Sequence, residues 1–261
     1  MKFSGLVSNG RLRVVGGAAL VVLALAAFVA IVLDVQLDRL ITRGFVTRSL
    51  EMATPIALAA IGGLYAEKSG VFNIGLEGFM IFGAFSAAAT MFLLGGTSPT
   101  QGQLWLGMGV ATLISAGFAV GFGVLLIRYK ADQIVAGLAV WFIALGFAPF
   151  AAATIWGSRS SPGLTSIDAL AFGQSPMVFV TVIVVALAWV VLYRTRYGYW
   201  IQAAGENPKA LDTAGVDVNR VRYATVIFSG AMAGLAGAVL LAHAGNWVGT
   251  GDTMVDGRGW I

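Results

Sequence analysis

Cysteine is absent from this 261-residue chain, and histidine occurs once, at His243. The lack of cysteine excludes disulfide bonds, thiolate metal sites and a cysteine nucleophile. His243 lies in an apolar, alanine-rich run, where we expect a structural polar side chain near a helix end. Walker-type phosphate loops and the HExxH zinc motif are also missing, so any ATP must be hydrolysed by another protein. These absences predict a protein without metal or other cofactor.

Charged residues are scarce, at 11% of the chain, whereas soluble domains carry about a quarter. Hydrophobic residues account for 58% of the chain, and the mean hydropathy is +0.87. This composition indicates an integral membrane protein. The net charge of +4 is a surplus typical of cytoplasmic loops rather than of a nucleic-acid-binding surface. No pair of carboxylates stands at catalytic spacing on a polar segment, so no enzymatic activity is expected.

Seven apolar stretches are long enough to cross a bilayer, which takes roughly 20 residues per helix. They are Val14–Leu33, Leu50–Ala66, Leu76–Leu94, Leu104–Ile127, Ile134–Ile155, Pro176–Tyr193 and Tyr223–Ala244. The first is longer than the apolar core of a usual signal peptide and has no small-residue cleavage site after it, so we expect it to be retained. The predicted fold is all-α, a polytopic transmembrane helix bundle that forms a single domain over residues 1–261.

Glycine is abundant, with 35 residues, and some glycines recur at helical spacing. Gly117 and Gly121, and likewise Gly230 and Gly234, place small residues four positions apart on one helix face. Such pairs let helix backbones approach closely in lipid, so both pairs are predicted to lie at helix contacts.

Lys and Arg residues are distributed unequally between the two sides of the predicted membrane. With the N-terminus inside, the inner segments hold eleven of the 16 Lys and Arg residues, and the outer segments hold five. The positive-inside rule therefore predicts a cytoplasmic N-terminus and a cytoplasmic segment Tyr193–Arg222. A re-entrant break within 65–75 would reverse the sides upstream of it but not downstream. Asn246 and Trp247, just after the last stretch, are expected to be anchors at the membrane interface.

The segment Tyr193–Arg222 is the only long polar stretch, and it carries five of the Lys and Arg residues around a core of small residues. A polar insert between two apolar spans suits the docking of a soluble partner. Within it, Pro208 fits the first turn of a short helix, and Asn207 before it fits the cap. The chain is thus predicted to be one subunit of a larger machine.

A second polar stretch, Tyr65–Phe79, places ionisable and amide side chains between two apolar runs, with several glycines among them. Glycines at this density weaken a regular helix, and exposed backbone groups at membrane depth must line protein or a water-filled path. The pattern predicts a broken or re-entrant helix near 65–78, whose second half would direct its positive N-terminal end at a ligand. A short cytoplasmic loop with solvated charges is the alternative.

Three runs of sequence carry a resemblance to a known family. SGVFNIGLEG (Ser69–Gly78), ADQIVAGLAVWFIALG (Ala131–Gly146) and the long run Arg194–Ala238 resemble the permease subunits of ABC importers for nucleosides and related simple sugars. The chain is most similar to the smaller of the two paralogous permeases that such systems pair. The resemblance covers residues from about Ala53 to the C-terminus, and it places the protein in a prokaryotic cell membrane.

The resemblance implies several partners: ATP-binding cassette ATPase subunits, a second, paralogous permease, and an extracytoplasmic substrate-binding lipoprotein of the basic-membrane-protein type. It also implies that the segment 194–222 couples the permease to the ATPase. The residues expected to make this coupling contact are Gly205, Glu206, Asn207, Pro208, Ala214 and Gly215.

The resemblance also suggests a substrate path through Asn73, Gly75, Glu77 and Trp141. Asn73 and Glu77 would hydrogen-bond a ribose or base edge, Gly75 would let the backbone approach, and Trp141 would stack. Glu77 has an alternative role as a carboxylate that stabilises the first helical turn. Trp141 stands where related permeases usually have asparagine, which puts the substrate preference in doubt. The chain also ends where related permeases enter further apolar spans, so its C-terminus is expected to be short.

The favoured function is ATP-driven uptake of nucleosides. A permease for simple sugars such as pentoses is the main alternative. Another alternative is an ion-driven transporter that uses Glu67, Asn73 and Glu77 as a relay. The long segment Tyr193–Arg222 argues against it, because a self-sufficient carrier needs no docking site for a soluble partner. A membrane scaffold that binds the ATPase without transport is the remaining alternative.

Overall fold

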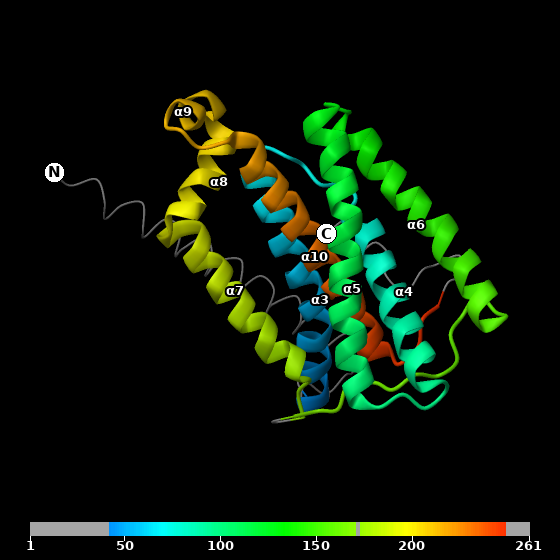
Figure 1. Cartoon of the computed structure of the whole chain (residues 1–261). Helices are drawn as coiled ribbons and strands as arrows, with labels where there is room; N and C mark the ends of the chain where they lie inside the picture. The colour runs from blue at the N-terminus through cyan, green and yellow to red at the C-terminus, as the bar shows by residue number, and fades with distance from the viewer. Residues whose placement is uncertain (1–41, 171–172, 249–261) are drawn as a thin grey trace, which may run out of the picture. The chain divides into compact units, whose positions relative to one another are not determined.

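The computed structural model describes residues 42–170 and 173–248. The chain divides into two compact units, Met1–Ser49 and Leu50–Ile261. The helices are α3 (Arg43–Lys68), α4 (Leu76–Gly95), α5 (Gln101–Gly123) with a π-helical turn at Val124–Arg128, α6 (Gln133–Trp156), α7 (Pro176–Arg194), α8 (Arg196–Glu206), α9 (Pro208–Thr213) and α10 (Val218–Ala244) (Figure 1). The described residues otherwise form turns and connections, with one isolated β-bridge between Ser160 and Val248.

The predicted all-helical membrane fold is confirmed. Six helices in the described part of the chain are long and apolar enough to cross a membrane: α3, α4, α5 with its π-helical turn, α6, α7 and α10. They coincide with six of the seven predicted stretches, and the remaining one, Val14–Leu33, lies outside the described residues. The two shorter helices, α8 and α9, lie within the predicted polar segment Tyr193–Arg222.

Helix α10 is the centre of the second unit and packs against α3, α4 and α5 through small residues. A Cβ atom on Gly62 of α3 would lie 2.8 Å from the carbonyl oxygen of Ser229. Gly83 of α4 directly contacts the backbone of Gly234, and Gly230 contacts Ala119 of α5. These close approaches are how helices gain packing contacts in lipid.

The glycine-pair prediction is therefore half right. Gly230 and Gly234 do lie at the contact between α10 and α5. Gly117 and Gly121 instead lie on the outer face of α5, where a Cβ atom would have no described neighbour within 4 Å. Two pairs with the same spacing thus differ in whether another helix covers them.

Most helices begin at a side chain that accepts hydrogen bonds from the first free backbone N–H groups. The capping residues of α5 to α10 are Thr100, Asp132, Ser175, Thr195, Asn207 and Asp217. Helix α4 differs, because its N-cap is Gly75 and has no side-chain cap. The start of α4 must therefore be held by contacts with other elements.

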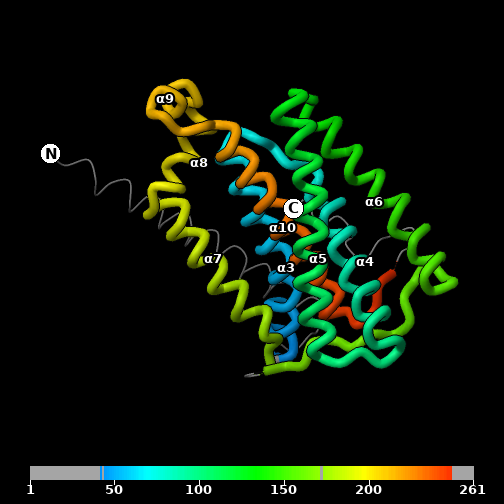
Figure 2. The backbone as a smooth tube through the Cα atoms, in the orientation of Figure 1, coloured from blue at the N-terminus to red at the C-terminus, as the bar shows by residue number. Residues whose placement is uncertain are grey.

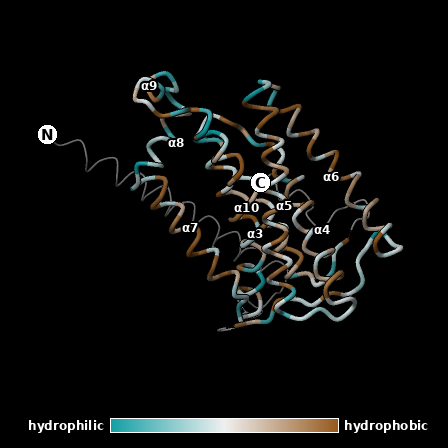
Figure 3. Tube along the Cα trace, viewed as in Figure 1, coloured by the Kyte–Doolittle hydropathy of each residue, from teal (hydrophilic) through white to brown (hydrophobic). Residues whose placement is uncertain are grey.

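Helices α6 and α7 form the least covered part of this unit. In the 18-residue apolar stretch of each helix, only 22% of the residues of α6 and 17% of those of α7 are buried, whereas 67% are buried in α4 and in α10. Figure 3 shows that both helices are largely hydrophobic along their length. Their exposed apolar side chains suit contact with lipid or with another membrane subunit.

The prediction that Trp247 is an anchor at the membrane interface is wrong, because this residue is buried within the protein. Its side chain is 1% exposed and packs on Phe85 and Trp156, with ring centroids 5.5 and 5.8 Å away. The backbone N–H of Trp247 donates to Ser161 Oγ at 2.9 Å, which ties the end of α10 to the connection after α6.

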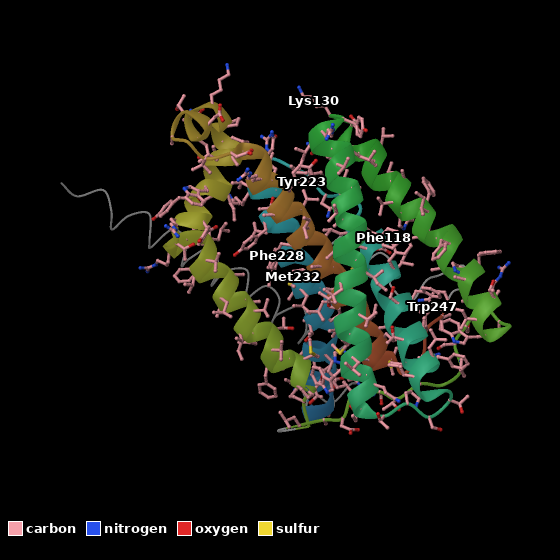
Figure 4. All side chains as sticks on the ribbon, viewed as in Figure 1. Phe118, Lys130, Tyr223, Phe228, Met232 and Trp247 are labelled. Atoms are coloured by element: carbon pink, nitrogen blue, oxygen red, sulfur yellow. The ribbon has the colours of Figure 1, made fainter. Side chains whose placement is uncertain are left out.

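Basic residues gather at one end of the bundle. Helices α8 and α9, the α5–α6 turn and the connection between α3 and α4 all lie at this end (Figure 2). Figure 4 shows Lys130 at the tip of the α5–α6 turn. The cations in these segments and in the adjoining ends of α3, α7 and α10 are Lys68, Arg128, Lys130, Arg194, Arg196, Lys209, Arg220 and Arg222. Arg159 is the one Lys or Arg residue at the opposite end between residues 50 and 248.

Candidate functional site

The connection between α3 and α4 lies at the basic end of the bundle. Helix α3 ends at Lys68 and α4 begins at Leu76, so the predicted interruption near 65–78 is present, as the connection Ser69–Gly75. Gly70 adopts a φ of 84°, which L-residues with side chains rarely adopt. Beyond this turn the chain runs inward, and Asn73 and Gly75 are buried.

Asn73 is the buried polar residue that holds this connection in place. It is 5% exposed, its Nδ2 donates to Ser229 Oγ on α10 at 2.9 Å, and its Oδ1 accepts from the Gly75 N–H at 3.0 Å. The two bonds compensate for the desolvation of the amide. They also attach the uncapped start of α4 to the central helix.

Glu77 lies in the first turn of α4 and is 2% exposed. The N-terminal end of a helix carries a partial positive charge, which stabilises a carboxylate at this position. Among the described residues, no cluster of acidic or histidine side chains that could hold a metal ion occurs. The arrangement therefore places one buried carboxyl group and one buried amide at the start of α4.

Trp141 lies beside this region because α4 and α6 make a close backbone contact. A Cβ atom on Gly78 would be 3.0 Å from the Cα of Trp141, and one on Gly75 would be 3.4 Å from Val140 Cβ. The Phe72 N–H also donates to Gln133 Oε1 of α6 at 2.7 Å. The structure thus brings Gly75 and Trp141 to the contact between the start of α4 and the first half of α6. The Asn73 side chain bonds instead to α10, and Glu77 is buried in the first turn of α4.

The predicted coupling segment consists of α8, a sharp turn at Asn207, and α9. Asn207 Oδ1 accepts from the Ala210 N–H at 3.1 Å, and Pro208 occupies the first position of α9. The predicted cap and first-turn proline are therefore confirmed. Glu206, Asn207, Ala214 and Gly215 are exposed, and they form an outward-facing ledge at the basic end.

Gly205 differs from its neighbours because it faces the protein interior. A Cβ atom there would lie 2.5 Å from the Lys68 carbonyl oxygen and 3.1 Å from the Gly70 nitrogen. The end of α8 therefore packs directly on the turn that follows α3. Of the six predicted coupling residues, Gly205 makes the contact to the connection Ser69–Gly75.

Sequence reasoning did not identify how the two polar regions are joined. Arg222 of α10 donates from Nε to the Ser69 carbonyl at 3.1 Å and from Nη2 to the Ala204 carbonyl at 3.0 Å. Thr225 Oγ1 donates to Ser69 Oγ at 2.7 Å. Arg222, Thr225 and Ser229 are spaced by three and four positions, which places them on one helix face. This spacing is the sequence signal for a polar face on α10.

Arginine side chains also stack on aromatic rings where α7 meets α8. The Arg194 guanidinium lies 5.5 Å from the Trp189 ring, and that of Arg196 lies 5.1 and 5.8 Å from the rings of Tyr197 and Trp200. Such pairs are typical of a membrane–water interface. The start of α8 is thus suited to that boundary.

Two apolar hollows, each of about 220 Å³, open on the second unit. One lies between α3, α8 and α10 beside Tyr65, Trp200 and Phe228, and the other lies between α3 and α7 beside Thr54 and Thr181. Neither hollow is lined by the four predicted path residues. In this conformation Asn73, Gly75 and Glu77 are covered by neighbouring helices.

Residues 45–254 match the family described as branched-chain amino acid transport system / permease component. The chain belongs to this permease family. The matched residues include the six apolar helices, the interruption between α3 and α4, and the polar insert with α8 and α9. The proteins that it resembles within the family are transporter permeases rather than enzymes.

Several relatives are similar over most of the chain. The guanosine ABC transporter permease NupQ of Bacillus subtilis is 36% identical over 214 residues, which covers 74% of this chain and 66% of NupQ. The nucleoside ABC transporter permease NupC of Lactococcus lactis is 32% identical over 236 residues, covering 83% of this chain and 72% of NupC. The putative glucose ABC transporter permease TsgC13 of Haloferax volcanii is 33% identical over 236 residues, which covers 84% of this chain and 68% of TsgC13.

This chain therefore spans about two thirds of the length of the relatives that it matches. No solved structure matches it. ABC transporter permeases such as those it resembles work in general with separate ATPase subunits and substrate-binding proteins.

Proposed function

We propose that this chain is a membrane-spanning permease subunit of an ATP-driven nucleoside importer. The observation that supports this proposal most strongly is the exposed ledge of α8 and α9, packed through Gly205 on the connection that leads to Asn73 and Glu77. A ledge attached to a buried polar site is what a subunit driven by a soluble motor requires. The similarity to NupQ and NupC supports nucleosides as the substrate class.

The ATPase partner would dock on the ledge at Glu206, Asn207, Ala214 and Gly215. Pro208 and the cap at Asn207 hold the turn between α8 and α9 in one geometry, so little conformational freedom is lost on docking. The concentration of basic residues at this end supports a cytoplasmic location for it. The N-terminus would then lie in the cytoplasm of a prokaryotic cell, as expected from the sequence.

The remaining partners would occupy the other free surfaces of the permease. A second, paralogous permease would cover apolar faces of α6 and α7, which this unit leaves largely exposed. A substrate-binding lipoprotein would dock at the end that carries Trp247 and the connection after α6.

The substrate would pass along the contact between α4 and α6, which is formed at Gly75 and Trp141 and lies next to Asn73 and Glu77 in the chain. Separation of the two helices at Gly78 would expose the amide of Asn73, the carboxyl group of Glu77 and the indole of Trp141 together. Amide and carboxyl groups suit the hydrogen-bonding edges of a ribose or base, and an indole suits stacking. A simple sugar is the second candidate substrate, supported by the similarity to TsgC13.

The test is uptake by cells that express this chain together with its neighbouring transport genes. Labelled guanosine, ribose and glucose are supplied in parallel, with a functional or a hydrolysis-deficient ATPase. The proposal predicts guanosine uptake that requires ATP hydrolysis and persists with a protonophore. Uptake of a sugar alone would establish the second candidate, and uptake that a protonophore abolishes while the inactive ATPase does not would refute both.

A further inference from the structure

We propose that Arg222 is the positioning residue that transmits movement of the coupling segment to the start of α4. This inference rests on the proposed function, because it assumes that an ATPase displaces α8 and α9. Arg222 does not touch the substrate in this proposal. It determines whether a displacement of the ledge also moves Asn73 and Glu77, or only deforms the contact between α8 and the turn after α3.

Three segments far apart in the sequence meet at the Arg222 guanidinium. The end of α8 contributes the Ala204 carbonyl, the turn after α3 contributes the Ser69 carbonyl, and α10 contributes Arg222 itself. Both bonds have a charged donor and lie at 3.0 and 3.1 Å, so each is stronger than a neutral hydrogen bond. The guanidinium therefore joins the coupling segment and the connection to one point on the central helix.

The junction is stiff because glycines allow direct backbone contact beside the guanidinium. A Cβ atom on Gly70 would lie 3.2 Å from the Gly205 Cα and 3.3 Å from Arg222 Nη2. A flexible side chain between the two backbones could change its rotamer when one backbone moves. Two main chains in direct contact must move together. A displacement of α9 by the ATPase would thus move Gly70 by a similar distance.

The polar face of α10 carries this displacement from Ser69 to Asn73. Arg222 binds the Ser69 carbonyl, Thr225 binds the Ser69 hydroxyl and Ser229 binds the Asn73 amide. The connection is therefore fastened at both its beginning and its buried middle. Since α4 has no side-chain cap at Gly75, these bonds help to position its first turn, which contains Glu77.

Arginine fits this junction better than lysine. The two carbonyl groups belong to different segments, and the planar guanidinium reaches them with two divergent N–H donors in fixed geometry. An ammonium group is a compact donor on a flexible stem and would favour one carbonyl at a time. Arg222→Lys is thus expected to keep the charge and the fold while weakening the transmission.

The neighbouring Arg220 provides a matched control. Its side chain is 88% exposed and pairs at 3.3 Å with Asp217, which caps the same helix. Arg220→Gln removes the same charge from the same helix turn without touching Ala204 or Ser69. An effect of surface charge on ATPase docking would appear in both variants, whereas an effect on transmission would appear only at Arg222.

The experiment uses the complete transporter in proteoliposomes, with guanosine uptake and ATP hydrolysis measured together. Arg222→Gln is expected to lower the guanosine imported per ATP hydrolysed by about tenfold or more, a common size for coupling between sites. Arg222→Lys should give an intermediate ratio, and Arg220→Gln the wild-type ratio. Wild-type ratios in both Arg222 variants would overturn the proposal, and if Arg222→Gln does not assemble, the Arg222→Lys ratio decides.

A second readout follows the movement itself. Because the chain has no cysteine, spin labels can be attached at Phe72→Cys on the connection and Phe150→Cys on α6, both on exposed side chains. Trapping the ATPase with ATP should change the label distance in the wild-type background and leave it unchanged with Arg222→Gln. A wild-type complex that neither imports guanosine nor shifts on ATP overturns the proposed function, whereas a wild-type shift retained in Arg222→Gln overturns only the role of Arg222.

Discussion

Replacement of Gly205 by alanine is the smallest change that tests the contact between the coupling segment and the connection. The added Cβ would lie 2.5 Å from the Lys68 carbonyl oxygen, whereas non-bonded heavy atoms prefer roughly 3.5 Å or more. The end of α8 must therefore move away by about 1 Å. Such a shift stretches the 3.0 Å bond from Arg222 to the Ala204 carbonyl beyond normal hydrogen-bond length.

The expected change in stability follows from two opposing contributions. Overpacking of a tight contact costs about 1–3 kcal/mol, and replacing a helical glycine by alanine returns roughly 0.5–1 kcal/mol. The net destabilisation should be on the order of 1 kcal/mol, which is too small to unfold the bundle. The loss of coupling should be larger than this value indicates, because the displaced atoms belong to the contact that is proposed to transmit movement.

The assay compares Gly205→Ala with Gly121→Ala in the assembled transporter. Gly121 is also helical, but an added Cβ there meets no described atom within 4 Å, so this variant should be neutral or slightly stabilised. Thermal melting of the solubilised complex and guanosine uptake per ATP are measured for each. If Gly205→Ala melts and transports like the wild type, the close packing of α8 on the connection has no role in coupling.

Three further predictions concern the bundle and the proposed path. Asn73→Ala should destabilise the fold by about 1–3 kcal/mol, because Ser229 loses its buried partner; a melting curve that matches the wild type would contradict this. Trp141→Asn should shift uptake between guanosine and sugars in a competition assay, and an unchanged preference would remove Trp141 from the path. Gly234→Leu should prevent assembly because the residue contacts α5, whereas Gly117→Leu should assemble, as membrane extraction and size-exclusion chromatography would show.

The membrane spans were the most predictable part of this protein. Hydropathy records directly which segments must avoid water, so six predicted stretches coincide with helices. The turn at Asn207 and Pro208 was predictable for a different reason, since a cap and a first-turn proline act within a few residues of each other. Local physics of this kind is readable without knowledge of the fold.

Contacts between distant segments were not predictable in the same way. Gly117 and Gly230 have the same small-residue pattern, but only the tertiary arrangement determines that the latter meets a neighbouring helix. Trp247 has the expected position for an interfacial anchor, yet the chain after α6 folds back over it. Arg222 was identifiable only as one basic residue among several, because its partner Ser69 lies 153 positions away.

The close packing around α10 has a consequence for how a conformational change can occur. Where α3, α4 and α5 meet α10 backbone to backbone, none of them can rotate or slide by a fraction of a turn without a steric clash. These four helices should therefore move as one rigid body. Helix α6 touches this body through one close contact with α4, beside Gly78, and α7 has the smallest buried share of the six long helices, so α6 and α7 are the elements against which that body can rock.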